Sequence, residues 1–552
     1  MAKPNDDCSS RSLFVAAATL LALVAISFIP PVDAGGVSLR RASIFSDLIR
    51  FDDDTADKAP DEAPEIDEEE YHVDLDKVAE TVARTTVSSS PTGAETSVSW
   101  AGIFDEQPTG GETDDMTNGS AAITEEPEPV EDFADILPAD SLVIPIEDFG
   151  AADSTALGRL YEKLLAGEPV RIAFMGDSFV EGDILTADLR ESLQDTFGGG
   201  GVGFVPAASP FTGFRQTVKT LSKGWTPYNI MQRKSVPEPY SGDFFVSGWV
   251  ARASDGASTR WEMTRKRRHL DRCRRARLLF ICREPAKITV KLNDDELREF
   301  GFDGGDAVRQ IVIEDDSIAS LEMTVRSGAA GLVGYGAEFD DLGGVSLDNF
   351  SVRSNNGQAM FWTDPAVNAQ INNMRGYDLV ILQYGLNIMQ ADRHDYSLYA
   401  RQVEKMIRFA ESCFPSAAVI VMGVSDRSQK NEDGIVPMES ARDLSRWQRE
   451  AASACGAAFW NTYEAMQLMG GMTRFVANGW AGKDYTHINY AGGAQVAGAL
   501  YHAILLGVRD YGRAMRERME KSRPVITEPL LEIEPLANDN LLTDSTAIDF
   551  TK

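Results

Sequence analysis

Cysteine and histidine are both scarce in this chain, and their spacing excludes a zinc module. The 552 residues include five cysteines and five histidines. No two cysteines form a CxxC pair, and no cysteines and histidines are spaced like zinc ligands. We therefore expect no metal site and no cofactor. Cys273 and Cys282 could bridge a hairpin if the protein is exported, and unpaired thiols are the alternative.

Lys and Arg are also few compared with Asp and Glu, and the excess of acidic residues lies toward the two ends of the chain. Residues 51–140 contain 27 Asp and Glu against three Lys and Arg, and residues 525–552 contain six against one. The formal net charge is −32, of which only about −4 falls in residues 141–524. Because phosphate binding requires basic surface, the sequence predicts no nucleic-acid partner.

An apolar run near the N-terminus has the character of an export signal. Basic residues precede residues 13–29, and Val32 and Ala34 suit a signal-peptidase site. This run has 17 residues, which is the short limit for a membrane span. Residues 1–35 are therefore predicted to be a signal peptide or an N-terminal membrane anchor. Either form places the protein outside the cytoplasm, in the periplasm, secreted, or anchored facing the periplasm.

The acidic stretch that follows has too few apolar residues to build a core. Residues 36–140 are rich in Asp, Glu, Thr, Ser and Pro, so we predict a disordered linker that self-repulsion keeps extended. A short helix around residues 75–84 is the one regular element expected there. The acidic tail, residues 525–552, is predicted to be disordered as well.

Strands and helices alternate in residues 141–214 and again in residues 351–524. Residues 170–184 are typical of a strand, a tight turn and a helix, and residues 377–384 and 417–424 are further buried strands. This alternation predicts a three-layer α/β/α fold with a parallel sheet. The functional site of such a fold lies at the carboxyl edge of the sheet.

Residues 215–350 change character, because short β-like runs separated by turn residues replace the helical pattern. The sequence therefore predicts an inserted β-sandwich inside the parent domain. Eight basic residues lie in residues 265–277. A solvated hairpin end is the favoured interpretation. Contact with an anionic glycan, or with the acidic linker of the chain itself, is the alternative.

Three separate segments each place one reactive group at a strand end or before a helix. Ser178 offers a hydroxyl, which becomes a nucleophile when a base takes its proton. His487 is the natural base, and Asp484, three residues earlier, can orient it. Asn387 offers an amide donor to a developing oxyanion. Together these four residues predict acyl transfer at a serine.

The blocks Gly176-Asp177-Ser178, Gly385-Leu386-Asn387 and Asp484-x-x-His487 resemble blocks I, III and V of the SGNH (GDSL) hydrolase superfamily. Block II of that family supplies a glycine N–H to the oxyanion hole, and Gly357 is the best match here. The resemblance implies that Ser178 is the nucleophile, His487 the base and Asp484 its orienting partner. The N–H groups of Ser178 and Gly357, with the Asn387 side chain, would form the hole.

The segment that begins GDSFVEGDILTADLRESLQDTFGGGGVGFV resembles one branch of this family, the bacterial peptidoglycan O-acetylesterases. In that branch a carbohydrate-binding-like β-sandwich is inserted between blocks I and II. Two positions depart from the branch pattern: Phe179 stands where histidine is frequent, and Ile388 where aspartate is common. Neither departure removes a triad member, and both bear on the substrate.

The resemblance implies an esterase that removes O-acetyl groups from an exported polysaccharide, peptidoglycan above all, through an acetyl-serine. An acetylated polysaccharide is the partner that this activity requires. A glycan O-acetyltransferase would use the same triad, and a lipase or thioesterase could be built on the same fold. A non-catalytic cell-wall-binding protein is a further alternative. The presence of a suitable residue at every catalytic position argues against it.

Overall fold

The computed structural model describes residues 32–34, 37–39, 69, 71–88, 97–101, 133–150, 155–211, 213–295, 297–432 and 434–522. Nearly all of the predicted export signal, most of the acidic linker and the whole tail lie outside these residues. Strands β1 (Val32–Ala34) and β2 (Val37–Leu39) pair with each other in antiparallel fashion. Every other element belongs to one compact unit within residues 64–552.

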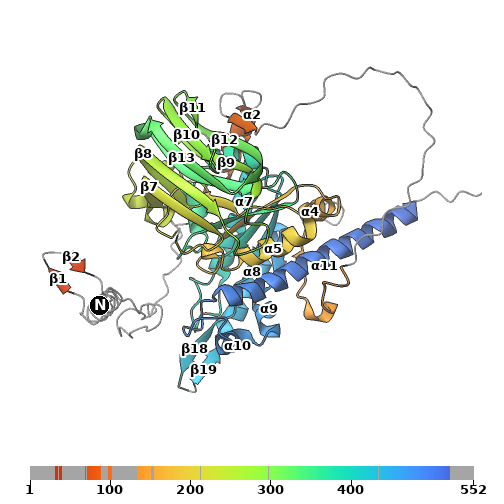
Figure 1. Cartoon of the computed structure of the whole chain (residues 1–552). Helices are drawn as coiled ribbons and strands as arrows, with labels where there is room; N and C mark the ends of the chain where they lie inside the picture. Colours follow the sequence, from red (N-terminus) through yellow and green to blue (C-terminus); the bar gives the residue numbers. More distant parts are fainter. Residues whose placement is uncertain are drawn as a thin grey trace, which may run out of the picture. The chain divides into compact units, whose positions relative to one another are not determined.

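A six-stranded sheet forms the first part of this unit (Figure 1). Its strand order is β15 (Val345–Ser351), β5 (Val170–Gly176), β16 (Leu379–Gln383), β17 (Ala418–Met422), β20 (Ala458–Trp460) and β4 (Glu147–Asp148). The first five strands are parallel, and β4 runs antiparallel to β20. The predicted alternation of strands and helices around a parallel sheet is confirmed.

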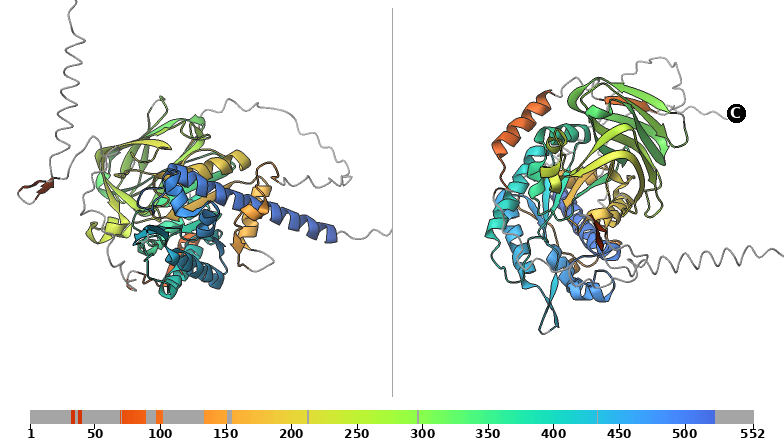
Figure 2. Two further views of the ribbon diagram at one scale, coloured as in Figure 1. Left: turned by 90° about the horizontal axis from the view of Figure 1, so that it is seen from below. Right: turned by 90° about the vertical axis from the view of Figure 1, so that its left-hand side faces the viewer.

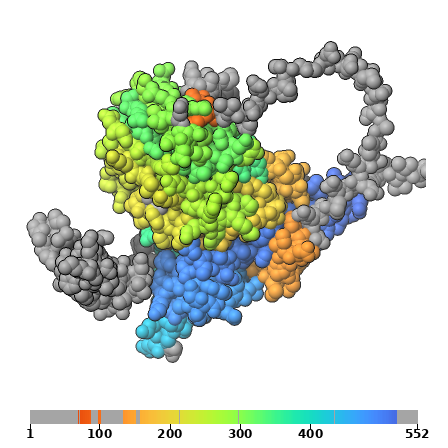
Figure 3. All heavy atoms as spheres, in the orientation of Figure 1, coloured from red at the N-terminus to blue at the C-terminus, as the bar shows by residue number. Residues whose placement is uncertain are grey.

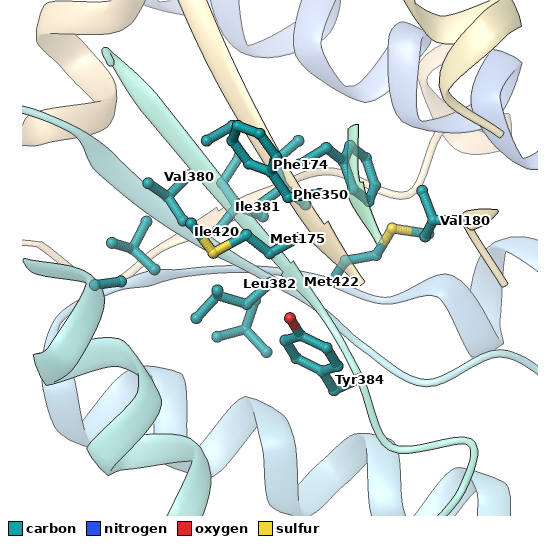
Figure 4. Close-up of a cluster of buried hydrophobic side chains, with 14 of the residues drawn as sticks. Phe174, Met175, Val180, Phe350, Val380, Ile381, Leu382, Tyr384, Ile420 and Met422 are labelled. Carbon is teal, nitrogen blue, oxygen red and sulfur yellow. The ribbon is translucent and has the colours of Figure 1, made fainter. Parts of the chain in front are cut away.

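The central strands are buried along their whole length, as their continuous apolar sequences require. All five residues of β16 and of β17 are buried, and in β5 only Arg171 is partly exposed. Phe174, Ile381 and Ile420 come from three neighbouring strands and pack together in the core (Figure 4). Burial on both faces fixes the strand ends, where the candidate site residues lie.

Two sets of helices pack against this sheet (Figure 2). The first set is α4 (Ala156–Leu165), α5 (Thr186–Phe197) and α11 (Tyr490–Ser522), and the second is α6 (Pro365–Arg375), α7 (Ser397–Cys413) and α8 (Glu439–Cys455). Strand β17 contacts helices of both sets. Two short helices, α9 (Thr462–Leu468) and α10 (Gly471–Ala477), precede the loop that carries Asp484 and His487.

By length and composition α11 is long and apolar enough to cross a membrane. However, 61% of its most apolar window is buried inside the protein. Its buried residues include Val496 and Leu500, and it packs against α4 and α5. This packing is that of a helix that contributes to a protein core.

The second part of the unit is a ten-stranded sheet with its own hydrophobic core. Its strands are β3 (Ser97–Ala101), β6 (Gly203–Pro206), β7 (Val218–Asn229), β8 (Trp249–Met263), β9 (Cys273–Cys282), β10 (Ala286–Leu292), β11 (Arg298–Phe302), β12 (Gly305–Ile318), β13 (Ser320–Ser327) and β14 (Leu332–Asp340). All its pairings are antiparallel except the one between β3 and β12. In Figure 3 the ten-stranded region, coloured yellow to green, adjoins the C-terminal helices, coloured blue.

The predicted boundary of the insert at residue 350 is wrong. Strand β15 pairs in parallel with β5 over seven residues, from Val345–Val170 to Ser351–Gly176, so it belongs to the six-stranded sheet. The misassignment has a simple cause: a short buried strand has the same apolar pattern in a parallel sheet as in an antiparallel one. The all-β region ends with β14, at Asp340.

Within residues 36–140 the predicted short helix is confirmed, whereas the prediction of disorder is wrong for a strand further along. Helix α2 (Leu75–Ser88), close to the predicted short helix, packs against α6 and α7 and buries Val78 and Val82. Strand β3 adds to the edge of β12, where Trp100 is buried and the Arg298 guanidinium lies 3.9 Å from its ring centroid. Long-range packing orders both segments, and composition alone does not reveal such packing.

A disulfide between Cys273 and Cys282 is excluded by their positions. These residues are the first and last of the extended strand β9, and both are free thiols. Nine residue steps in a strand span roughly 30 Å, whereas the Cα atoms of a disulfide lie about 4.4–6.8 Å apart.

The basic run at residues 265–277 connects β8 and β9, which do not pair with each other, so it is not the end of a hairpin. Arg265 and Lys266 are exposed, whereas two arginines of the run pair with acids of the six-stranded part. Arg267 contacts Asp188 at 3.0 Å, and Arg268 contacts Glu191 at 3.1 Å. Arg268 also contacts Asp195. These three acids lie on α5, so the run attaches the ten-stranded sheet to the helix that follows the candidate nucleophile.

We expect the double substitution Arg267→Gln and Arg268→Gln to lower the free energy of unfolding by about 1 kcal/mol, because both ion pairs are partly solvated. Urea unfolding measures this change. The control replaces Arg265 and Lys266 by glutamine, since neither forms an ion pair with the described residues. A loss of hydrolysis confined to polymeric substrate, with stability unchanged, would instead restore the glycan-contact interpretation.

A buried cluster of charges joins the two sheets. Arg375 of α6 contacts Asp348 of β15 at 3.1 Å and Glu338 of β14 at 3.3 Å, and it also contacts Asp340. Asp340 is further paired with Arg275 at 2.9 Å. Buried charges are tolerated only when they are paired in this way. The cluster holds β14 against β15, the neighbour of β5, after which Ser178 follows.

Candidate active site

Ser178 lies in a tight turn directly after β5. Gly176, the last residue of the strand, has no room for a side chain, because an added Cβ atom would lie 2.7 Å from the Val180 methyl and 3.0 Å from Gln383 Oε1. The Asp177 carboxylate accepts the N–H of Phe179 at 2.9 Å and closes the turn. Ser178 is partly exposed, while Asp177 and Phe179 are buried. The turn therefore presents the serine at the carboxyl edge of the sheet.

The helix after this turn starts later than the sequence predicts. Residues Glu181–Asp183 form a 3-10 turn in which Gly182 and Asp183 have φ angles of 67° and 66°. This left-handed backbone interrupts an α-helix, so α5 begins only at Thr186. The N-terminus of α5 therefore does not follow Ser178 directly.

His487 and Asp484 form a hydrogen-bonded pair in the loop before α11. His487 Nδ1 lies 2.8 Å from Asp484 Oδ2. The N–H groups of Thr486 and His487 donate to Asp484 Oδ1 at 3.1 and 3.2 Å. Burial opposes the charge of Asp484, but these hydrogen bonds outweigh it and lower its pKa to about 2. The ionised carboxylate orients the imidazole and leaves Nε2 directed away from it.

Asn387 and Asp177 contact each other at the ends of two neighbouring strands. Asn387 Nδ2 donates to Asp177 Oδ2 at 3.2 Å, and it lies 3.4 Å from the carbonyl oxygen of Asn355. Burial raises the pKa of Asp177 to about 7, although the hydrogen bond from Phe179 and the charge of His487 both oppose this shift. Asp177 thus positions the Asn387 amide in addition to shaping the turn.

The structure brings the predicted residues to one edge of the sheet. Strands β5 and β16, which precede Ser178 and Asn387, are direct neighbours. The loop with Asp484 and His487 crosses this edge: the Tyr485 carbonyl accepts the N–H of Ser428, and the Tyr490 hydroxyl donates to the Gly182 carbonyl at 2.8 Å. The Ser178 hydroxyl forms no hydrogen bond with the described residues. Catalytic hydrogen bonds are frequently open before substrate binds.

Gly357 lies close to these groups, but its N–H already has an acceptor. It donates to the side-chain oxygen of Asn355 at 2.8 Å. A side chain at this position would clash with Met406, whose sulfur would lie 2.3 Å from an added Cβ. The predicted role of Gly357 as an oxyanion donor therefore requires that the bond to Asn355 be shared or exchanged.

The sequence motifs did not reveal Arg427, which follows the end of β17. Its side chain is partly buried, and burial lowers its pKa although the charge of Asp484 opposes this shift. Nε of Arg427 is buried without a hydrogen-bond partner, and the described residues offer it no ion pair. The segment Gly423-Val424-Ser425-Asp426 marks this strand end in the sequence, but arginine after it has no distinctive spacing.

A metal-binding site is not found in the described part of the chain. No group of three or more His, Cys, Asp or Glu residues there is arranged to hold a metal ion. What the geometry offers is a serine, a histidine paired with a carboxylate, and an amide donor. This set of groups is suited to acyl transfer at a serine.

Solved structures share part of this fold. A peptidoglycan O-acetylesterase structure matches with a TM-score of 0.54 and 22% identity, covering 66% of this chain and 99% of that one. The chain therefore has the fold of that structure, which agrees with the resemblance stated from the sequence.

Other matches are weaker. A family two carbohydrate esterase from Cellvibrio japonicus matches with a TM-score of 0.22 and 8% identity, covering 53% of this chain and 98% of that one. A family 29 carbohydrate-binding module matches with a TM-score of 0.17 and 11% identity, covering 25% of this chain and 91% of that one. No protein-family model and no curated protein matches the chain.

The raised pKa of Asp177 predicts a pH-dependent stability. An aspartate has a pKa near 3.8 when unfolded, and that of folded Asp177 is about 7, so the folded state binds more protons between these values. This contribution is fully present below about pH 4 and is lost as the pH rises through 7, by up to about 4 kcal/mol. Asp177→Asn should remove it. Urea unfolding of both proteins at pH 4.5, 6 and 7.5 measures the difference, and parallel curves would contradict this assignment.

Proposed function

We propose that the protein is a serine esterase that removes O-acetyl groups from an exported polysaccharide, peptidoglycan being the favoured substrate. The observation that carries this proposal is the placement of Ser178, the Asp484–His487 pair and Asn387 at one sheet edge. The likeness in fold to a peptidoglycan O-acetylesterase supports the choice of substrate.

In the proposed reaction the Ser178 hydroxyl attacks the carbonyl carbon of the acetyl ester while His487 Nε2 takes its proton. Asp484 holds the proton on Nδ1 and stabilises the imidazolium. The tetrahedral intermediate collapses when His487 gives its proton to the sugar oxygen, which leaves as an alcohol. Water then attacks the acetyl-serine with His487 again as the base. Acetate and free Ser178 result.

The oxyanion of both intermediates needs donors that are in place beforehand. The Asn387 amide is one such donor: Asp177 fixes its position, and its 3.4 Å approach to the Asn355 carbonyl is long enough to be exchanged for an oxyanion. The N–H groups of Ser178 and Gly357 are the other donors that we assign to this hole.

The proposal also covers the architecture and the location of the protein. We propose a three-layer α/β/α hydrolase domain in which the ten-stranded region is an inserted, carbohydrate-binding-like β-sandwich that docks polymer. The apolar run at residues 13–29 would direct the protein out of the cytoplasm. Export is required because the proposed substrate lies in the cell wall.

Acetate release tests the proposed activity. The purified protein is incubated with acetylated peptidoglycan, acetylated xylan, acetylated alginate and a long-chain acyl ester, and free acetate or fatty acid is measured. We expect release from peptidoglycan to exceed release from the others. Preferred cleavage of the long-chain ester would contradict the proposal in favour of a lipase. Transfer of acetyl to an added glycan acceptor, in place of acetate release, would identify an acetyltransferase.

A further inference from the structure

A pocket lies directly beside the turn that carries Ser178. On one side it is lined by Glu181 and Gly182, three and four residues after the serine, and by Ser351 at the end of β15. Ser351 is in register with Gly176, the residue at which β5 ends. On the other side Trp249 of β8 lines the pocket. The six-stranded and ten-stranded sheets therefore both contribute to it.

One wall of this pocket is aromatic. The rings of Phe211 and Trp249 lie 6.0 Å apart in an edge-to-face arrangement, and the guanidinium of Arg353 lies 5.3 Å from the Phe211 ring centroid. Arg353 is held in place by Glu181, with Nε 3.0 Å from Oε2. Phe211 nevertheless remains 37% exposed, so an apolar surface is accessible at this wall.

The same pocket contains two buried polar atoms that lack partners. Thr220 Oγ1 and Asn349 Oδ1 are buried and form no hydrogen bond with the described residues. A buried polar atom without a partner costs free energy, so such atoms point to a ligand or to bound water. Asn349 is itself held by bonds from its Nδ2 to the Val180 carbonyl at 3.0 Å and to Asp183 at 2.9 Å.

We propose that this pocket is a subsite for a sugar ring next to the acetylated unit of the glycan. A pyranose has apolar faces that pack on an aromatic ring, and its rim of hydroxyl groups can donate to Asn349 Oδ1 and pair with Thr220 Oγ1. An acyl chain would leave both polar atoms unpaired. An anion is disfavoured because the two arginines that line or border the pocket are already paired, Arg353 with Glu181 and Arg215 with Asp183. The assignment rests on the proposed function.

The subsite supplies binding energy remote from the ester, which raises kcat/KM only for substrates long enough to reach it. Phe211→Ala should therefore lower kcat/KM about tenfold on an acetylated disaccharide from peptidoglycan, and Thr220→Val about threefold. Neither should change the hydrolysis of 4-nitrophenyl acetate, which reaches only Ser178. Leu221→Ala is the matched control, because Leu221 follows Thr220 in β7 and is 51% exposed but does not line the pocket.

A binding measurement tests the subsite independently of the proposed esterase activity. Calorimetric titration of the Ser178→Ala protein with the unacetylated disaccharide should show binding that Phe211→Ala weakens about tenfold. If the wild-type protein releases no acetate from any glycan but this binding is seen, the proposed activity fails and the subsite stands. Equal loss on disaccharide and 4-nitrophenyl acetate, no loss on either, or binding unaffected by Phe211→Ala would overturn the subsite.

Discussion

Ser178→Ala should abolish acetate release, with kcat at least about 10³-fold lower and the fold unchanged. The hydroxyl follows β5 at the sheet edge that the loop with the Asp484–His487 pair crosses, so a paired histidine is available to activate it. The side chain is small and partly exposed, and it forms no hydrogen bond with the described residues. Its removal therefore creates neither a cavity of consequence nor an unpaired buried group. Initial rates of both proteins measure the loss of activity, and circular dichroism shows whether the fold is unchanged.

Ser192→Ala is a suitable control, because Ser192 lies on α5 and is also partly exposed. It should retain the wild-type rate. Full activity of Ser178→Ala would falsify the assignment of the nucleophile, and loss of activity together with loss of folded structure would show that Ser178 acts through the fold.

Asn387→Ala should lower kcat by about 10²–10³-fold, which is the usual cost of removing one oxyanion donor. KM should change little, because the amide stabilises charge that develops only in the transition state. The amide meets the geometric requirement that it be fixed in advance, since Asp177 accepts its N–H at 3.2 Å. Steady-state kinetics on the acetylated disaccharide provide both constants.

Asn478→Ala, at an exposed position after α10, is the control for this substitution. A rise in KM with kcat unchanged would make Asn387 a binding residue. The hole would then have to be built from the backbone N–H groups of Ser178 and Gly357 alone.

The sequence predicted the strand ends well, because buried parallel strands have continuous apolar runs and the polar residues after them are conspicuous. Ser178 and Asn387 follow β5 and β16 as expected, and Asp484 lies within hydrogen-bonding distance of His487. The spacing of three residues in one loop was sufficient for that contact. Their catalytic roles stay predictions until activity is measured.

The sequence could not predict features that depend on long-range contacts. The bond between Asp177 and Asn387 joins residues 210 positions apart, and the ion pairs of Arg267 and Arg268 reach acids on α5. Strand β3 lies in a segment whose composition indicated disorder, yet it pairs with β12. The pocket beside Ser178 likewise depends on Trp249 of β8, which no catalytic motif marks.

Active-site labelling tests the central claim most directly. A serine-directed fluorophosphonate reacts only with a serine that a neighbouring base activates. The wild-type protein should lose activity in step with modification of Ser178, as mapped by peptide mass spectrometry, and His487→Ala should be modified far more slowly. Modification of another serine in Ser178→Ala, or acetate release that continues while Ser178 is fully labelled, would contradict the account.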